Sequence, residues 1–207
     1  DLMKVRARTG AMVETPSFYP YLTARQNLEY YRIQRGIPGK GTVDQVLEET
    51  DLANTGKKVF KNFSLGMKQR LGLALALMNR PDFLLLDEPI NGLDPEGIVE
   101  FRNLLLKLNR ERQTTILISS HILPELANLA TCYGFIDNGV MLEQITARAL
   151  EEKCRACIEV GVEDPSAASL VLEQKLGTRD YEVLSGGILR LYSFLDQPQT
   201  VAKVLVE

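Results

Sequence analysis

A short apolar run that stops at two carboxylates constrains this chain more than any other feature. Phe83 to Leu86 are large apolar residues without a polar break, and Asp87 and Glu88 follow at once. Such a run predicts a strand buried on both faces, in the middle of a parallel sheet. Ligands of open α/β sheets bind beyond the carboxyl ends of the strands. There, one acid could hold Mg²⁺ and the other could orient a water in phosphoryl transfer; a solvated acidic turn is the alternative.

Two further segments flank this run. Upstream, Ser64 is a good N-cap for an apolar helix from Leu65 to Asn79, which we expect to pack against the sheet. Downstream, residues 114–119 predict a second buried strand, and His121, the only histidine of the chain, follows it. A histidine at a strand end beside the two acids could donate a hydrogen bond to a phosphate, although a lone histidine is more often structural.

These segments, in this order and at these spacings, resemble the ATPase subunit of ABC transporters. The signature sequence (residues 63–70), the Walker B strand with its adjacent glutamate, the D-loop (residues 93–95) and the switch histidine all have counterparts. The variant F-S-L-G-M-K-Q-R is similar to the signature of the bacitracin- and lantibiotic-resistance branch. The resemblance covers about the first two-thirds of the chain, and four ordered motifs are far more specific than one.

The resemblance implies a set of catalytic and metal-binding residues. Asp87 would hold Mg²⁺, Glu88 would polarise the attacking water, and His121 would contact the γ-phosphate of ATP. Glu14 stands where the family has the glutamine of its Q-loop. A carboxylate is a good magnesium ligand but cannot donate a hydrogen bond, so the metal role fits Glu14 better than the water-orienting one. An exposed loop acid is the alternative for Glu14.

The resemblance also implies nucleotide contacts across a head-to-tail dimer. The signature turn would approach nucleotide held by a second subunit, and its residues are Ser64, Leu65, Gly66 and Met67. Leu65 replaces a family glycine and Met67 a glutamine, so a looser contact is expected there. Asp94 is expected at the subunit boundary. It is also a natural N-cap, with Pro95 at the first helical position, for a helix to about Arg112.

No segment fits the phosphate-binding loop G-x-x-x-x-G-K-[ST] that this family uses. Gly39-Lys40 and Gly56-Lys57 lack both the earlier glycine and the following Ser or Thr. We therefore expect an α/β fold with an incomplete RecA-like P-loop NTPase core, an ABC helical subdomain and a small C-terminal α+β domain. The chain would be a fragment or a truncated product. On its own it is expected to be inactive as an ATPase and to bind ATP weakly.

The pattern predicts a boundary near residue 145. Residues 1–145 would form the ABC-type nucleotide-binding domain, with its helical subdomain at about 16–66, and residues 146–207 an accessory domain of β-α-β-β-α order. Within the subdomain, an aromatic loop of Phe18, Tyr19 and Tyr21 is a satellite core or, by resemblance, part of the groove that receives a helix of the membrane partner.

Composition excludes some partners. The net charge of −3 gives no case for nucleic acid, and no apolar run approaches the length of a membrane span. Cys154 and Cys157 have the C-x-x-C spacing but lack the second half of a zinc motif. The resemblance implies a cytoplasmic subunit at the inner face of the membrane, bound to a transmembrane permease subunit and to a second nucleotide-binding subunit, as a homo- or heterodimer.

The function that follows is ATP hydrolysis, with Mg²⁺, in an ABC exporter of antimicrobial peptides or similar amphiphiles, and hence antibiotic resistance. The alternative is a truncated, catalytically inactive ABC-like module that acts in binding or dimerisation. A soluble ABC ATPase of translation or DNA repair is disfavoured, because such chains carry tandem cassettes or coiled-coil insertions and this chain has neither.

Overall fold

The computed structural model describes residues 2–14, 16–39 and 41–206. Lys40 of the Gly39-Lys40 pair therefore lies outside the described residues. The chain forms two compact units, Asp1–Ala130 and Thr131–Glu207, and each is described by itself. This division falls before the hairpin at residues 132–146, whereas the sequence pattern groups that hairpin with the first domain.

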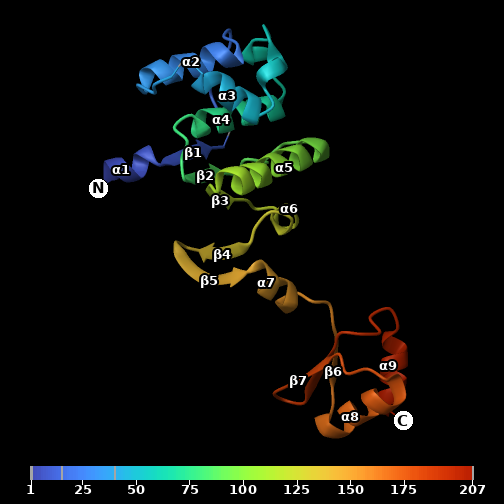
Figure 1. The fold of residues 1–207 in the computed structure, drawn as a ribbon. Coiled ribbons are helices and arrows are strands. Elements are labelled where there is room, and N and C mark those ends of the chain that lie inside the picture. Colours follow the sequence, from blue (N-terminus) through green and yellow to red (C-terminus); the bar gives the residue numbers. More distant parts are fainter. Residues whose placement is uncertain (1, 15, 40, 207) are drawn as a thin grey trace. The chain divides into compact units, whose positions relative to one another are not determined.

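Unit 1 is built on a three-stranded parallel sheet (Figure 1), ordered β1-β2-β3. The strands are β1 (Thr9–Val13), β2 (Phe83–Asp87) and β3 (Thr115–Ser119). Leu84 and Leu86 of β2 are fully buried, but Leu85 between them is 41% exposed. The expectation that this strand is buried on both faces is therefore wrong for the described residues: α4 and α5 contribute to a single core with the Leu84 face, and the Leu85 face is open.

Helix α4 (Leu65–Leu77) lies against β1, as expected for so apolar a helix. Two glycines permit a very close approach. A Cβ atom on Gly10 would lie 2.4 Å from the backbone oxygen of Ala76, and one on Gly72 would lie 2.2 Å from Cγ of Pro16. Only glycine fits at such contacts, so Gly10 sets how closely β1 approaches α4, and Gly72 sets how closely α4 approaches Pro16 in the segment after β1.

The helical subdomain packs above α4 in Figure 1. It comprises α2 (Ala24–Gln34), α3 (Thr42–Glu49) and the short turns η1 (Ala53–Thr55) and η2 (Phe60–Asn62). Thr23 and Gln26 form a capping box at the start of α2. In the aromatic loop, Phe18 is buried with edge-to-face contacts to Tyr31 and Phe60, whereas Tyr19 and Tyr21 are exposed.

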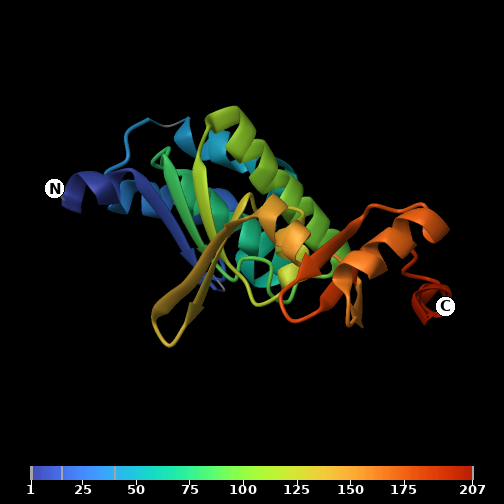
Figure 2. The same ribbon diagram turned by 90° about the horizontal axis from the view of Figure 1, so that it is seen from below.

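The rest of unit 1 consists of α1 (Leu2–Ala7), α5 (Pro95–Arg112) and α6 (Leu123–Ala127). Figure 2 shows α5 running alongside the three strands. Its buried residues Phe101, Leu104, Leu105 and Leu108 join the main core.

Unit 2 begins with an antiparallel hairpin of β4 (Cys132–Asp137) and β5 (Val140–Thr146). Its turn residues Asn138 and Gly139 have φ angles of 47° and 78°, as a tight hairpin turn requires. Helix α7 (Ala147–Lys153) follows.

The remaining elements of unit 2 are β6 (Ile158–Gly161), α8 (Pro165–Val171), η3 (Leu172–Leu176), β7 (Tyr181–Leu184), β8 (Ile188–Leu191) and α9 (Pro198–Val206). The β-α-β-β-α order predicted from the sequence is confirmed. The antiparallel sheet is ordered β6-β8-β7 around a small core of Ala168, Leu172, Leu189, Leu191 and Val201. None of the helices in the described parts of the chain is long and apolar enough to span a bilayer.

Candidate functional site

The parallel strands of unit 1 end together and place several polar residues at one edge of the sheet, here called the rim. Val13, Asp87 and Ser119 are the last residues of β1, β2 and β3, and they lie opposite one another in the strand register. Glu14 directly follows β1, and Glu88 directly follows β2. The rim is therefore the carboxyl edge of the sheet, where α/β proteins bind ligands.

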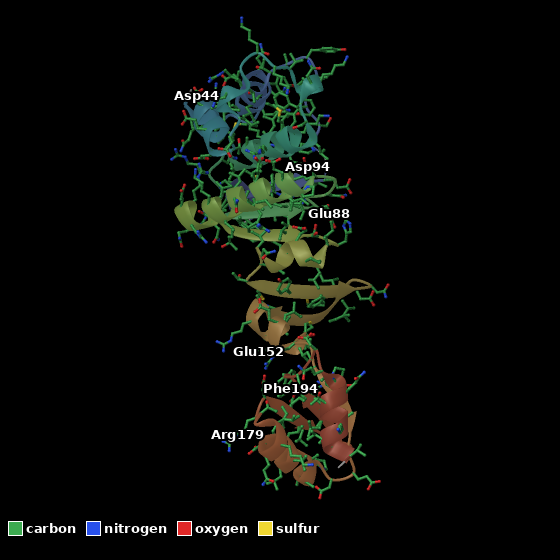
Figure 3. All side chains as sticks on the ribbon, turned by 90° about the vertical axis from the view of Figure 1, so that its right-hand side faces the viewer. Asp44, Glu88, Asp94, Glu152, Arg179 and Phe194 are labelled. Atoms are coloured by element: carbon green, nitrogen blue, oxygen red, sulfur yellow. The ribbon has the colours of Figure 1, made fainter. Side chains whose placement is uncertain are left out.

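Glu88 and His121 are in direct contact at this rim. Nδ1 of His121 lies 2.9 Å from Oε2 of Glu88, although the two residues are 33 apart in sequence. The carboxylate can only accept, so Nδ1 carries a proton and donates it in this bond. The other ring nitrogen, Nε2, then accepts in the neutral ring and donates only in the imidazolium form. Figure 3 shows Glu88 and Asp94 on the same side of unit 1.

Ser119 joins Asp87 to the backbone of Glu88. The Ser119 hydroxyl donates to Oδ1 of Asp87 at 2.6 Å and accepts a hydrogen bond from the backbone N–H of Glu88 at 3.0 Å. The sequence interpretation missed Ser119. A hydroxyl at the end of a predicted strand was visible, but its register with the Asp-Glu strand was not.

Glu14 reaches the rim through its backbone. Its N–H donates to the carbonyl oxygen of Asp87 at 3.1 Å, and its side chain is exposed. Glu14 and Glu88 both have positive φ angles, 43° and 45°. A left-handed conformation in a residue other than glycine costs about 1–3 kcal/mol and concentrates at functional sites. The chain therefore turns sharply at the end of β1 and again at the end of β2.

The described residues contain no group of three or more His, Cys, Asp and Glu side chains arranged to hold a metal. In proteins Mg²⁺ is usually bound through one or two carboxylates, with waters and substrate phosphates as its other ligands.

The signature turn contacts the D-loop of the same chain. Ser64 caps α4 by accepting the N–H of Met67 at 3.3 Å. The Cδ2 atom of Leu65 lies 3.1 Å from where a Cβ of Gly92 would be, and Cδ2 of Leu93 lies 3.9 Å from that of Gly66. The Leu65 side chain, absent where the family has glycine, thus lies beside Gly92, the residue directly before the D-loop.

Asp94 and Arg70 make further contacts close to the signature turn. Asp94 caps α5 as expected, accepting the N–H of Gly97 at 3.0 Å. Arg70, largely buried, pairs with Asp51 at 2.9 Å and with Glu100 at 2.7 Å. Because Asp51 belongs to the helical subdomain and Glu100 to α5, Arg70 connects the two.

The Leu65–Gly92 contact gives a testable stability effect. Gly92 has φ +75°, so Gly92→Ala adds both left-handed strain and a contact that displaces Leu65. We expect the free energy of unfolding of unit 1 to fall by more than the about 1 kcal/mol of the strain alone. Gly36→Ala is the matched control, because Gly36 has φ +65° and no atom within 4 Å of its Cβ position. Equal losses in urea unfolding of the two variants would contradict the contact.

Comparison with known proteins places the chain in context. The family model described as "ABC transporter" matches residues 1–91. The bacitracin transport ATP-binding protein BcrA of Bacillus licheniformis is 45% identical over 204 residues, which are 99% of this chain and 67% of that protein. The lantibiotic transport ATP-binding protein SrtF of Streptococcus pyogenes is 43% identical over 145 residues, 70% of this chain and 61% of that protein. The chain thus spans about three fifths to two thirds of these relatives.

Solved structures show the same fold. The chain is similar to cbiO1 from Clostridium perfringens, part of the ABC transporter complex cbiONQ, with a TM-score of 0.67 and 25% identity over 73% of this chain and 62% of that one. It is also similar to the ATP-binding cassette MJ0796 bound to ADP and Pi, with a TM-score of 0.60 and 25% identity over 71% of this chain and 66% of that one. The predicted α/β fold of an ABC ATPase is confirmed.

Proposed function

This chain belongs to the ATP-binding subunits of ABC transporters, in the branch of the bacitracin and lantibiotic transport proteins, and we propose that it serves ATP-driven export. In this proposal the whole subunit hydrolyses ATP and couples hydrolysis to a transmembrane permease subunit. The cargo is an antimicrobial peptide or similar amphiphile, and its removal confers resistance. The subunit lies at the inner face of the membrane through that partner.

The contact of Glu88 with His121, beside Asp87, is the observation that supports hydrolysis most directly. Glu88 orients the attacking water and accepts its proton. His121 donates from Nδ1 to the Glu88 carboxylate and so holds it in one orientation. As an imidazolium it could also donate from Nε2 to the γ-phosphate of ATP.

Asp87, with Glu14 at the end of the neighbouring strand, would hold Mg²⁺. When bound, Mg²⁺ would supply positive charge that offsets the negative charge developing on the transferred phosphate. The residues of the chain then contribute positioning and electrostatic stabilisation, because phosphoryl transfer needs little covalent chemistry from the protein.

The signature turn would complete the site of a second copy or a related subunit. Its residues begin a 13-residue helix whose first N–H groups and dipole favour a phosphate. We propose that Ser64, Leu65, Gly66 and Met67 meet the nucleotide of the opposite subunit, with Asp94 at the boundary. Contact of Leu65 with Gly92 would link the two loops in this interface.

The exposed aromatic side chains of the helical subdomain suit the membrane partner. Tyr19 and Tyr30 stack edge to face, with ring centroids 4.8 Å apart, and Lys61 lies 5.7 Å from the ring centroid of Tyr21. Aromatic residues are enriched in the cores of protein interfaces.

The proposed function is tested by ATP hydrolysis in the whole subunit reconstituted with its permease in liposomes. We expect magnesium-dependent hydrolysis that bacitracin or a lantibiotic stimulates. A reconstituted complex that binds the permease but hydrolyses no ATP would favour the dimerisation module instead.

Residues 1–207 alone are expected to bind ATP weakly. Their sequence has no G-x-x-x-x-G-K-[ST] loop, whose N–H groups and lysine surround the β- and γ-phosphates in this family. Titration calorimetry with magnesium-ATP is the measurement. A dissociation constant in the micromolar range would contradict this prediction.

A further inference from the structure

The Ser119 hydroxyl contacts both Asp87 and Glu88 at the rim. It is the last residue of β3, directly opposite Asp87 in the parallel register. Its oxygen is 2.6 Å from Oδ1 of Asp87 and 3.0 Å from the backbone nitrogen of Glu88. A single side chain from a different strand thus bonds the side chain of one acid and the backbone of the next.

The direction of both hydrogen bonds is fixed by chemistry. The Glu88 N–H can only donate, so the Ser119 oxygen accepts there. The single hydroxyl proton is then available for the Asp87 carboxylate, which can only accept when ionised. The two bonds are compatible and use the donor and one lone pair of the hydroxyl.

These hydrogen bonds constrain the carboxylate of Asp87 and the backbone of Glu88. Oδ1 of Asp87 is held by Ser119, which fixes the rotamer of that carboxylate and leaves Oδ2 for a cation. The N–H of Glu88 is tied to β3 just where Glu88 takes its left-handed φ of 45°. That turn directs the Glu88 side chain to His121, 2.9 Å away.

We infer that Ser119 is a positioning residue for hydrolysis, which sets the orientation of Asp87 toward the metal and of Glu88 toward the water. This inference rests on the proposed function for its consequence, but not for its geometry. Ser119 touches neither substrate nor metal in this scheme and acts through the two acids.

The experiment compares Ser119→Ala with Ser119→Thr in the whole subunit assembled with its permease. Threonine keeps the hydroxyl and suits a strand, and Ser119 is exposed, so the added methyl has room. For Ser119→Ala we expect kcat to fall about tenfold, and the Mg²⁺ concentration for half-maximal rate to rise, because a hydrogen bond to a charged group is lost. Ser119→Thr is expected to restore both.

Two further measurements separate positioning from a general effect on the fold. Hydrogen exchange of the Glu88 amide, without nucleotide, should quicken in Ser119→Ala and return to the original rate in Ser119→Thr. Thr115→Ala is the matched control: it removes a hydroxyl from the same strand and face, at the opposite end of β3, where Thr115 pairs with Phe83. We expect it to change neither kcat nor Glu88 exchange.

The outcomes distinguish failure of the Ser119 inference from failure of the proposed function. Unchanged Glu88 exchange in Ser119→Ala, or a Ser119→Thr variant as impaired as Ser119→Ala, would overturn the inference. So would unchanged kcat and magnesium dependence in Ser119→Ala. A wild-type complex that does not hydrolyse ATP would instead refute the proposed function, and amide exchange would still show whether Ser119 positions Glu88.

Discussion

Glu88→Gln is expected to lower the ATP turnover of the assembled transporter by about 10²–10⁴-fold, the range over which a positioned proton acceptor contributes to rate. The amide oxygen of glutamine still accepts the hydrogen bond from His121 Nδ1, now 2.9 Å from Oε2 of Glu88, so the geometry of the pair is kept. What is lost is the ability to accept a proton from water. The substitution leaves Asp87 and Ser119 untouched, so nucleotide binding should persist.

Steady-state hydrolysis and nucleotide titration of the same preparation test this separation of chemistry from binding. Glu111→Gln is the matched control, because Glu111 is an exposed acid near the far end of α5 and should leave turnover unchanged. Turnover of Glu88→Gln close to that of the wild type would remove Glu88 from its proposed role. Loss of binding together with turnover would show that Glu88 holds nucleotide instead.

Helix starts could be predicted because an N-cap acts through neighbours in the sequence. Thr23, Ser64 and Asp94 each accept a backbone N–H three residues further on, and each was recognisable by residue type and spacing. The meeting of Glu88 with His121 was predictable for a related reason. Each follows an apolar run, and the carboxyl ends of parallel strands share one edge of a sheet.

Strand register and the extent of burial could not be predicted, because neither is a local property. Ser119 faces Asp87 only in the observed pairing of β2 with β3, which no pattern in either strand specifies. Leu85 is as apolar as its neighbours, yet only Leu84 and Leu86 lie on the covered face. An apolar run is compatible with burial on one face or on two. The contact of Leu65 with Gly92 likewise depends on how two loops meet.

Gly10→Ala is expected to lower the free energy of unfolding of unit 1 by about 3 kcal/mol, the upper end of the usual cost of overpacking. The new Cβ would lie 2.4 Å from the backbone oxygen of Ala76 and 2.8 Å from Cδ2 of Leu84. The leucine side chain can rotate, but the helix backbone cannot yield without moving α4 as a whole. Ala11→Val is the matched control, since Ala11 is the next residue of β1 and is exposed on the open face. A larger, β-branched side chain there should be tolerated.

Hydrogen exchange under native conditions measures this loss, read separately from peptides of residues 2–130 and 131–206. The second unit then serves as an internal reference, because it forms its own core. Equal protection of unit 1 in Gly10→Ala and Ala11→Val would show that α4 is not seated against β1 as described. Gly10→Ala should also change the positions of residues at the rim and at the signature turn, because Glu14 follows β1 and α4 begins at the signature turn. The methyl group added by Gly10→Ala should therefore disturb both the rim and the signature turn, although it contacts neither.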